Sequence, residues 1–575
     1  MRQGWLALVV LAMCPIGRAD DVSVRLHWLQ SVSEVAIVPE SDALLLKCAN
    51  CPAAPFPKAL TVTAVGELLK LDLDGGTLGR IEISGRYRLE ISGDAPFSVS
   101  YPLRITAHDG HLQLVLRMPI EEYVAGVLAW ESSHFQSEES LKAMAVVVRT
   151  YAARFRGRHQ AEGFDFCDTT HCQGLRVSAV RERNREAAEA TEGELLWFQG
   201  EPARTYYHRD CGGATEDAGR LWPNSRAPYL RGVQDTYCVA KGRVAWSSEI
   251  TRQELEQALA AAGIVLPSSW ESFEVISRTP SGRVERLRII GRSSITLSAE
   301  NFRLAIGRAL GWERIRSDLY EVRESGERLV FQGYGAGHGV GLCQVGAARM
   351  GELGKRHIEI LSFYFPGTTL GVTAQGLRWQ ALGSEHAEVL TLEPKEDETL
   401  LPLIEQIIRD AEHQTGWRYA ARPQVRVYPS VAAFRNATGR PGWVAASTRG
   451  RTIRLQPARV LRANGTLTLT LLHELLHFLI ESRAGAGLPL WFREGLVLAL
   501  TQSGALVANS VTPRRTQELE GALRYAGTRE EMRKVYAEAK VLVQSLIAEY
   551  GQATVLGWVE RGLPPEVRTR LDSAR

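Results

Sequence analysis

The sequence lacks long runs of basic residues, internal repeats and low-complexity tracts. Its 68 Lys and Arg residues nearly balance its 65 Asp and Glu residues, which leaves a formal net charge of +3. Nucleic-acid binding depends on concentrated positive charge, so this balance gives no support to a nucleic-acid partner. With 575 residues, of which 45% are hydrophobic, the chain has enough apolar material for about two to four domains.

Beyond its first residues, the sequence also lacks an apolar stretch long enough to span a bilayer. Arg2 precedes the apolar run 6–13. Pro15 follows the run, and the segment 17–19, which ends on a small residue, suits a cleavage site. The run is too short for a membrane anchor, and its layout is typical of a secretory signal peptide over residues 1–19. We therefore expect an exported mature protein without a transmembrane segment, located in the periplasm, the cell envelope or the extracellular space.

Alternating apolar and polar positions predict short strands over about 20–117, punctuated by Gly, Asp and Pro. Two helices are predicted at about 121–131 and 137–156. Strand-like sequence resumes in parts of 200–340, with one helical segment near 252–263. These elements indicate an α+β multidomain protein in which a β-rich domain carries an inserted helix–loop–helix.

A change of sequence character marks a domain boundary. Polar, Glu-rich sequence after Gly371 predicts a linker at 375–398. It separates a domain of residues 20–374 from a C-terminal domain at 399–575, which opens on a strongly helical pattern at 400–415. We expect this C-terminal domain to be mainly helical, with a small sheet.

The predicted helix–loop–helix places a carboxylic acid beside an aromatic ring. The first helix ends at Trp130 and Glu131, and partial desolvation there would raise the pKa of Glu131 and suit it to donate a proton. On the second helix Lys142 and Arg149 are seven residues apart and share a face, which predicts a basic surface for an anionic or polyhydroxyl substrate. Without further context, a Glu at a helix end is usually a solvated residue, and the two cations fit an exposed polar face equally well.

Three sequence blocks resemble the stage II sporulation protein D and LytB amidase-enhancer family: MPIEEYVAGVLAWE, LKAMAVVVRTYA and GAGHGVGLCQVGAARM. The resemblance covers about 100–370. The family's enzymes are lytic transglycosylases of peptidoglycan glycan strands, so the resemblance implies that Glu131 is the catalytic acid/base. Some members are described as stimulating a cell-wall amidase, which implies an amidase as a partner.

A single carboxyl group suits this chemistry. Ordinary glycoside hydrolysis generally needs two carboxylates. A lytic transglycosylase instead uses the 6-hydroxyl of the muramic acid as nucleophile, so one Glu protonates the glycosidic oxygen and later accepts the hydroxyl proton. Glu121 and Glu122 are weak candidates for a second acid, up to three helical turns back. In the Gly-rich segment 333–346, His338 and Gln344 are the polar residues expected to line the cleft, although His338 fits a structural role in a tight turn nearly as well.

The cysteine count is odd once Cys14 leaves with the signal peptide, so the remaining seven cannot all pair within one chain. Cys48 and Cys51 predict a small disulfide loop or an incidental pair. No role is predicted for Cys238 or Cys343.

The motifs CDTTHCQ and YYHRDCGG each combine His and Cys, and two such pairs brought together by the fold would form a tetrahedral zinc site. A structural zinc with ligands near CDTTHCQ occurs in some members of the resembling family. Our preferred ligand set is Cys167, Cys172, His208 and Cys211. His171 competes for a place, and a disulfide between Cys167 and Cys172 is an equal alternative.

The C-terminal domain contains the pattern His473-Glu474-x-x-His477. Positions i and i+4 of a helix face the same way, so both imidazoles can bind one Zn²⁺ while Glu474 acts as base on the attacking water. Glu494, in WFREG on the next apolar helix, is the predicted third ligand. The extended pattern resembles the gluzincin metallopeptidases, particularly the minimal peptidase-MA-like group, over about 400–575.

Two further features accompany this pattern. A possible edge strand at 453–456 precedes the motif, and Tyr419 and Tyr428 are equal candidates for stabilising an oxyanion. Domains of this kind sometimes lose activity and serve as scaffolds.

Three hypotheses follow. The first is a two-activity wall enzyme, which cleaves peptidoglycan glycan strands through Glu131 and peptides through the zinc domain. The second is a metallopeptidase with a glycan-docking domain. The third is a non-catalytic amidase enhancer, for which replacing Glu131 would leave function intact.

Overall fold

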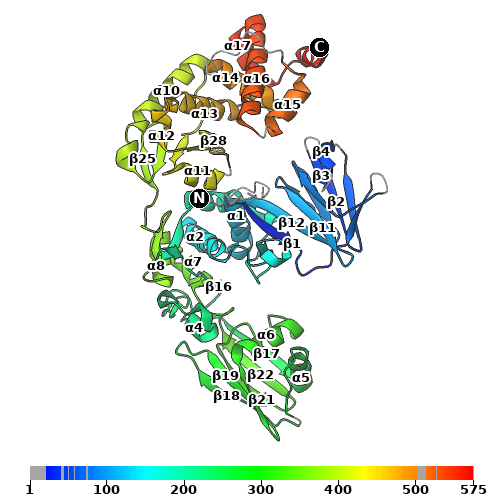
Figure 1. Cartoon of the computed structure of the whole chain (residues 1–575). Helices are drawn as coiled ribbons and strands as arrows, with labels where there is room; N and C mark the ends of the chain where they lie inside the picture. The colour runs from blue at the N-terminus through cyan, green and yellow to red at the C-terminus, as the bar shows by residue number, and fades with distance from the viewer. Residues whose placement is uncertain are drawn as a thin grey trace, which may run out of the picture. The chain divides into compact units, whose positions relative to one another are not determined.

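The computed structural model describes residues 21–573 except 41–43, 49–50, 57, 73–75, 268, 439, 486, 502–512 and 526–527 (Figure 1). The predicted signal peptide and Cys14 lie outside the described residues. The chain forms two compact units, Asp21–Leu377 and Arg378–Arg575. Their boundary falls within the predicted linker.

The predicted N-terminal strands form two sheets that pack against each other through β5, β6, β11 and β12. Alternation in these strands turns one face of each sheet to a shared apolar core that includes Val62, Ile81 and Ile105. In sheet order, the first sheet contains β13 (Phe166–Cys167), β1 (Asp21–Leu26), β12 (His111–Pro119), β11 (Leu103–His108), β8 (Arg80–Ser84), β3 (Leu44–Cys48) and β4 (Cys51–Phe56). The second contains β10 (Phe97–Val99), β9 (Tyr87–Ile91), β2 (Glu34–Pro39), β5 (Leu60–Val65), β6 (Leu68–Leu71) and β7 (Thr77–Leu78).

The predicted helix–loop–helix is present as α1 (Ile120–Glu131) and α2 (Glu138–Phe155). Strand β12 runs directly into α1 through Pro119, whose fixed φ suits the start of a helix. Helix α2 is buried along most of its length and contacts α1, α3, α7 and α8. The surrounding helices are α3 (Glu182–Ala190), α4 (Ala218–Leu221), α7 (Gln344–Glu352) and α8 (His357–Tyr364), with short 3₁₀ turns at Gln160–Glu162, Val177–Ala179, Pro223–Ser225 and Pro228–Leu230. Two small sheets join distant segments: β14 (Leu195–Phe198) with β15 (Glu201–Pro202) and β24 (Thr369–Gly371), and β16 (Tyr207–His208) parallel to β23 (Leu342–Cys343).

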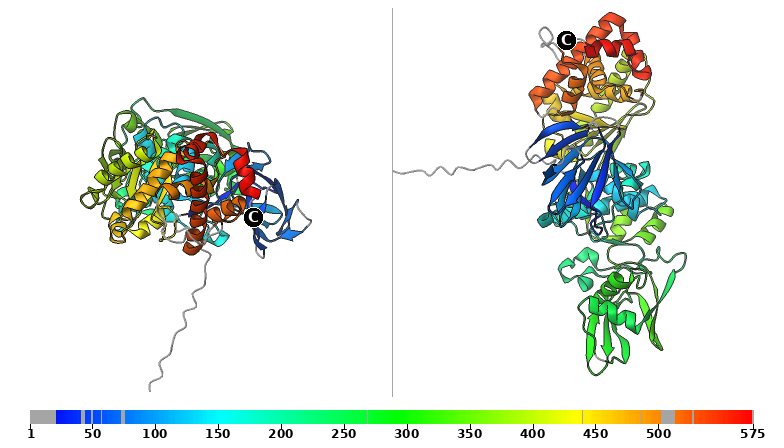
Figure 2. Two further views of the ribbon diagram at one scale, coloured as in Figure 1. Left: turned by 90° about the horizontal axis from the view of Figure 1, so that it is seen from above. Right: turned by 90° about the vertical axis from the view of Figure 1, so that its right-hand side faces the viewer.

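Between Cys238 and Cys343 the chain forms an inserted module with its own apolar core, around Phe302 and Phe331. This separate core was not predicted, although the helix expected near 252–263 is present as α5. Figures 1 and 2 show the module as a group of strands and helices separate from the paired N-terminal sheets. The module contains β17 (Ala245–Thr251), α5 (Arg252–Ala261), β18 (Ser272–Arg278), β19 (Val284–Ile290), β20 (Ser294–Ser298), α6 (Ala299–Leu310), β21 (Tyr320–Ser325) and β22 (Arg328–Tyr334).

The C-terminal unit combines one five-stranded sheet with helices, as expected. The strand order is β25 (Gln380–Gly383), β26 (Glu388–Thr391), β27 (Gln424–Val427), β29 (Thr452–Leu455) and β28 (Ala446–Arg449). The helices are α9 (Pro394–Asp397), α10 (Leu400–Thr415), α11 (Val431–Thr438), α12 (Ala458–Ala463), α13 (Leu467–Glu481), α14 (Leu490–Leu500), α15 (Thr516–Tyr525), α16 (Arg529–Tyr550), α17 (Gln552–Arg561) and α18 (Pro565–Ser573).

Two sequence predictions for this unit are corrected. The strand predicted at 453–456 is β29, which lies inside the sheet between β27 and β28, so β28 is the edge strand. Most of the predicted linker is ordered structure of this unit, because β25 and β26 form a hairpin joined to its sheet.

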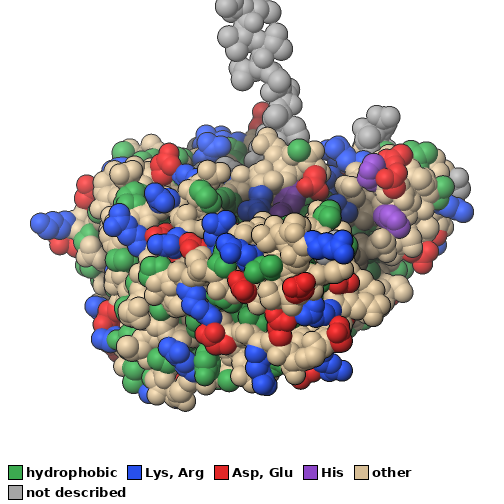
Figure 3. Space-filling view, turned by 90° about the horizontal axis from the view of Figure 1, so that it is seen from below, with side chains coloured by type: hydrophobic (Ala, Val, Ile, Leu, Met, Phe, Trp, Pro, Cys, Tyr) green, Lys and Arg blue, Asp and Glu red, His purple; other side chains and the backbone are tan. Residues whose placement is uncertain are grey.

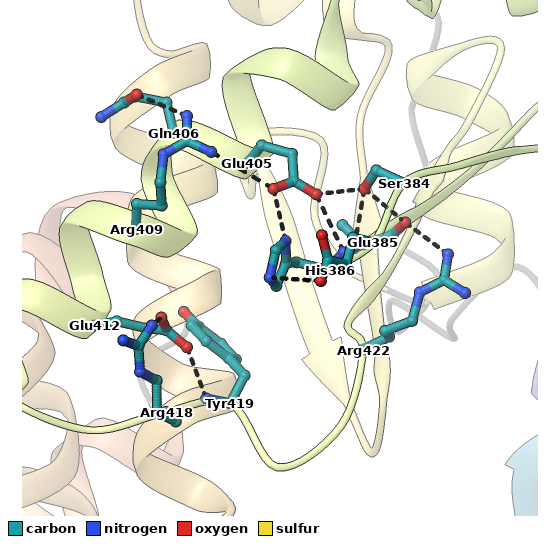
Figure 4. A network of polar contacts seen from close by, with 11 residues as sticks. Ser384, Glu385, His386, Glu405, Gln406, Arg409, Glu412, Arg418, Tyr419 and Arg422 are labelled. Carbon is teal, nitrogen blue, oxygen red and sulfur yellow. Dashed lines mark hydrogen bonds and ion pairs between the residues drawn. The ribbon is translucent and has the colours of Figure 1, made fainter.

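Polar contacts attach this hairpin to α10 (Figure 4). The Ser384 hydroxyl donates to Glu405 at 2.5 Å, and Nδ1 of His386 lies 2.9 Å from the other Glu405 oxygen. At the far end of α10, the backbone N–H of Tyr419 donates to Glu412 at 3.1 Å. No helix among the described residues has both the length and the apolar character needed to cross a bilayer.

Candidate functional site

Glu131 is the last residue of α1 and lines a cleft of about 1690 Å³ in the N-terminal unit. The neighbouring Trp130 is 49% exposed, and the Arg176 guanidinium lies 4.6 Å from the centre of one of its rings. The helix ends here because Ser132 leaves the helical conformation, although its N–H still bonds to the Leu128 carbonyl. The predicted acid and aromatic ring therefore stand side by side at the cleft wall.

The Glu131 carboxyl accepts the backbone N–H of Gly174 at Oε1, at a distance of 3.0 Å. The side chains of Tyr207 and Gln344 line the same cleft. Burial raises the pKa of Glu131 above its usual value, and the polar groups of Gly174, Gln344 and Tyr207 only partly offset this effect. A carboxyl group with a raised pKa retains its proton closer to neutral pH, as a general acid requires.

Both polar residues predicted from the Gly-rich segment line the same cleft. Gln344 begins α7 and is 3% exposed. His338 is half-buried, its ring centre lies 5.1 Å from that of Trp222, and its Nδ1 accepts the Val340 N–H at 3.1 Å. Burial lowers the pKa of His338 well below its usual value, so the ring is neutral near neutral pH.

The structure places Lys142 and Arg149 away from the cleft-lining residues, contrary to their predicted role in substrate binding. Arg149 points into the protein core, where it is 3% exposed and makes a two-pronged contact with Glu121 at 2.9 and 2.5 Å. Lys142 pairs with Glu139 on its own helix at 2.8 Å. The two cations share a helical face, as predicted, but that face packs against other elements of the unit.

Glu121 and Glu122, the weak candidates for a second acid, form contacts with other residues and do not line the cleft. Glu121 is paired with Arg149, and Glu122 accepts the Tyr101 hydroxyl at 2.6 Å and contacts Arg185 at 3.4 Å. Among the described residues that line the cleft, the other carboxylate is Glu313 of the inserted module. Glu313 is exposed and pairs with Arg316 at 2.8 Å.

Arginines dominate the charge of the cleft, a feature that the sequence reading missed. The view in Figure 3 shows basic, acidic and hydrophobic side chains interspersed on one face, so charge is not sorted over that surface. Within the cleft, by contrast, seven arginines face two carboxylates. Among the described residues, no carboxylate forms an ion pair with Arg158, Arg204 or Arg209. The seven arginines are Arg158, Arg181, Arg183, Arg204, Arg209, Arg303 and Arg316.

Two of the predicted zinc ligands, Cys167 and Cys172, lie in a cluster with His159 and His171 whose ligand atoms are all within 4.8 Å of one another. Cys172 Sγ lies 3.4 Å from His159 Nε2, and Cys167 Sγ lies 3.7 Å from His171 Nδ1. Both cysteines are free thiols, so they do not form the alternative disulfide in this structure. Two sulfurs and two imidazole nitrogens are a donor set suited to tetrahedral zinc.

The other two predicted zinc ligands lie elsewhere, so the predicted set is corrected. Cys211 belongs to a different cluster, and the Nδ1 of His208 contacts the Val340 carbonyl at 3.1 Å. Strand β16 carries this segment beside β23, whereas β13 carries Cys167 beside β1. Cys48 is disulfide-bonded, and the strand register places Cys51 opposite it, in agreement with the predicted small loop.

Comparisons with known proteins match this unit. A profile of the family described as stage II sporulation protein (SpoIID) matches residues 108–198, and one described as a domain of unknown function (DUF8618) matches 239–341. An uncharacterized protein of Brachyspira hyodysenteriae is 30% identical over 259 residues, which cover 45% of this chain and 68% of that protein. The chain belongs to the SpoIID family.

Named relatives are more distant. Stage II sporulation protein D of Bacillus subtilis is 28% identical over 288 residues, covering 47% of this chain and 79% of the relative. The amidase enhancer of the same organism is 25% identical over 293 residues, covering 43% and 40%. The SpoIID match contains Glu131 and the cluster of His159, Cys167, His171 and Cys172, while the second match coincides with the inserted module.

The C-terminal unit of this SpoIID-family chain lies outside both matched segments, and its three predicted metal ligands converge. His473 and His477 are on α13 and Glu494 is on α14. His477 Nε2 lies 3.2 Å from His473 Nε2 and 3.2 Å from Glu494 Oε2. Two imidazoles and one carboxylate match the ligands of catalytic zinc sites, which leave one position open.

The other polar residues considered for this site differ in their contacts. The Glu474 carboxylate accepts the Thr448 hydroxyl of β28 at 2.6 Å. The Tyr419 hydroxyl donates to the Leu475 carbonyl at 2.9 Å, so it holds α13 and is not free to bind an oxyanion. Tyr428, the other predicted tyrosine, is buried, whereas Tyr536 of α16 lies close to Glu494. The distance of Tyr536 from the motif in sequence explains why it was missed.

Proposed function

We propose that this protein is an exported peptidoglycan-remodelling enzyme whose cleft cleaves glycan strands as a lytic transglycosylase. The observation that carries the proposal is Glu131, a half-buried carboxyl group with a raised pKa at the wall of an arginine-lined cleft. Membership of the SpoIID family supports a role at the cell wall.

The surroundings of Glu131 suit a single residue that acts first as an acid and then as a base. Because Oε1 accepts the Gly174 N–H, the acidic proton belongs on Oε2, which can protonate the glycosidic oxygen. The C–O bond to the leaving sugar then breaks, and the 6-hydroxyl of the muramic acid attacks the anomeric carbon. Glu131, now ionised, accepts the hydroxyl proton, and the product carries a 1,6-anhydro end. The hydrogen bond from Gly174 and the nearby polar groups of Gln344 and Tyr207 stabilise the ionised form between these two steps.

The charge of the cleft supports an anionic glycan as substrate. Muramic acid units and their stem peptides carry carboxylates, and guanidinium groups bind carboxylates through paired hydrogen bonds. Arg158, Arg204 and Arg209 line the cleft and have no ion-pair partner among the described residues, so their guanidinium groups can bind such carboxylates.

We further propose a zinc peptidase in the C-terminal unit, supported by the convergence of His473, His477 and Glu494. These residues would hold Zn²⁺, which when bound polarises a peptide carbonyl and lowers the pKa of water. Glu474, positioned by Thr448, would take the proton from the attacking water and pass it to the leaving amine. Peptidoglycan contains both kinds of bond, so both units would act on one polymer.

Two alternatives make different predictions. One relative is named amidase enhancer, which supports a role as a non-catalytic partner of a cell-wall amidase. A metallopeptidase that uses the cleft only to dock onto glycan is the second alternative. Neither alternative needs a proton donor at position 131.

The test is incubation of the purified mature protein with glycan strands, both intact and stripped of stem peptides. Mass spectrometry would detect 1,6-anhydro ends in the wild type, in Glu131→Gln and in Glu474→Gln. Glu313→Gln is the matched control, because Glu313 is the other described carboxylate of the cleft. We expect anhydro products in all proteins except Glu131→Gln. No glycan cleavage by folded wild-type protein would reject the transglycosylase in favour of the enhancer or the docking domain.

A further inference from the structure

A second group of metal-ligand side chains lies outside the set that we predicted. Cys211, Asp235, Cys238 and Cys343 are all buried, and one ligand atom from each lies within 4.8 Å of the other three. The three cysteines are free thiols and form no disulfide with one another. Nothing in the proposed glycan or peptide cleavage uses this cluster.

Backbone N–H groups point at these sulfur atoms. Cys343 Sγ accepts the N–H of Cys211 at 3.3 Å and that of Gly346 at 3.4 Å, and Cys211 Sγ accepts the Gly213 N–H at 3.4 Å. Such bonds favour a thiolate over a thiol, because they stabilise negative charge on sulfur. Thiolates brought together in a buried site require a cation for charge balance.

The carboxylate of the cluster is held in place from two sides. Asp235 Oδ1 accepts the Cys238 N–H at 3.0 Å, and Oδ2 accepts the Tyr364 hydroxyl at 2.8 Å. A Cβ at Gly346 would lie 2.3 Å from Asp235 Oδ2, so only glycine permits the carboxylate to sit this close to α7. Supporting hydrogen bonds of this kind are typical of ligating carboxylates.

We propose that Cys211, Asp235, Cys238 and Cys343 bind a thiophilic divalent metal ion, with Zn²⁺ as the preferred ion. Three sulfurs and one carboxylate oxygen complete a tetrahedral set with no open position, as structural zinc sites do. A disulfide between two of the cysteines would leave the third thiol and the carboxylate buried without a cation.

The position of the cluster in the chain indicates that a bound metal would hold the inserted module in place. Cys238 immediately precedes the inserted module and Cys343 follows it, so one ion would fasten both chain ends at the base of the module. Cys211 and Asp235 belong to the surrounding SpoIID-family unit. Arg283 of the module reinforces this junction, because its buried guanidinium donates to the Cys211 carbonyl at 2.7 Å.

The same ion would position the part of the cleft that the module supplies. Cys343 directly precedes Gln344, which lines the cleft together with Glu131, and Arg303, Trp312 and Arg316 of the module line the same cleft. Fixing the module base therefore fixes where substrate-binding groups lie relative to the acid. The metal site itself does not depend on the proposed cleavage reaction.

The test measures metal bound per chain in the full mature protein, purified without chelators or reductants. All variants carry His473→Ala and His477→Ala to remove the C-terminal ligands. We expect about two metal equivalents in this background. Cys238→Ser and Cys343→Ser should each lose one equivalent, Cys172→Ser should lose the other, and Cys172→Ser combined with Cys238→Ser should lose both.

Cobalt substitution identifies which site was lost, because the sulfur-to-cobalt absorption scales with the number of bound thiolates. It should fall by about three fifths in Cys238→Ser and two fifths in Cys172→Ser, since the clusters hold three and two cysteines. If Cys238→Ser fails to fold, Asp235→Asn keeps every sulfur and should bind cobalt about 10-fold more weakly.

Three results would overturn the proposal. One is unchanged metal content in both folded Cys→Ser variants of this cluster. Another is a disulfide among Cys211, Cys238 and Cys343 in freshly isolated protein that has been denatured and alkylated. The third is cobalt affinity in Asp235→Asn equal to that of the background protein.

Discussion

The backbone N–H of Gly174 donates to Glu131 Oε1 at 3.0 Å, and this contact exists only because position 174 has no side chain. A Cβ there would lie 2.3 Å from Cδ1 of Trp130 and 2.8 Å from Oε1 itself. Gly174 follows Cys172 by two residues, so the cluster of His159, Cys167, His171 and Cys172 is linked to the acid through a very short segment. The position of the acid thus depends on the loop that carries Cys172.

Gly174→Ala should displace the Glu131 carboxyl and reduce glycan cleavage by about 10²-fold, as misplacement of a catalytic group by about 1 Å does. Overpacking should also lower the free energy of unfolding by about 1–3 kcal/mol. Product formation and chemical denaturation would measure the two effects. Gly79→Ala is the control, because a Cβ there meets no atom within 4 Å. Equal effects in both variants would contradict the proposed contact.

Glu131→Gln should lower the cleavage rate by about 10²–10⁴-fold without unfolding the protein, because it removes the proton donor but keeps the shape. In the wild type, kcat/KM should fall as pH rises through the native pKa of Glu131, which burial places above the usual value. A pH profile without this decline would argue against Glu131 as the acid.

The raised pKa of Glu131 should also affect how the stability of the protein depends on pH. The native carboxyl keeps its proton at pH values where the unfolded one has lost it, since its native pKa is raised. The free energy of unfolding should therefore fall as pH rises between the unfolded and native pKa values. Glu131→Gln should make this slope shallower, while other buried carboxyls with a raised pKa, such as Asp210, keep their share of it. Denaturation at several pH values would measure the difference between the two proteins.

The sequence predicts α1, α2, α5 and α10 well because each has a strong helical period, and the strands of 21–119 because they alternate regularly. Arg149 shows the limit of that reasoning. Seven-residue spacing puts Lys142 and Arg149 on one helical face, but only tertiary packing decides that Arg149 turns inward to Glu121. The spacing of residues along a helix determines which side chains share a face. It does not determine which other elements that face contacts.

The metal ligands were mispaired for a related reason. His159 lies eight residues before Cys167, outside any recognisable Cys/His spacing, and reaches the cluster through the turn after α2. Cys211 meets Cys343 because β16 and β23 are parallel neighbours, although 132 residues separate the two cysteines. The inserted module was missed because its strands alternate like those of the surrounding domain.

Arg149→Met should lower the free energy of unfolding by about 3–5 kcal/mol, because it leaves the buried Glu121 carboxylate without its partner. Lys142→Met is the matched control on the same helical face, and losing its half-exposed pair with Glu139 should cost about 0–1 kcal/mol. Denaturant titration would measure both values. Loss of substrate affinity in folded Lys142→Met would restore the original prediction of a basic binding face.

Arg209→Gln should raise the KM for stripped glycan strands by about 10-fold and change kcat little, because Arg209 lines the cleft but forms no hydrogen bond or ion pair with Glu131. The difference from wild type should shrink at high salt, which screens the attraction between exposed charges. Arg308→Gln on α6 is the control, since Arg308 is exposed but does not line the cleft. A fall in kcat without a change in KM would contradict a binding role.

His477→Ala should remove one metal equivalent and abolish peptide cleavage while leaving 1,6-anhydro products unchanged, because its ligand cluster belongs entirely to the C-terminal unit. Thr448→Val separates metal binding from positioning. It deletes the hydroxyl that donates to Glu474, so peptide cleavage should fall by about 10-fold with no loss of metal. Metal analysis and cleavage of stem peptides would measure both variants. If Thr448→Val loses metal as well, Thr448 supports the ligand helix α13 and not the base, and Glu474 loses its assigned positioning group.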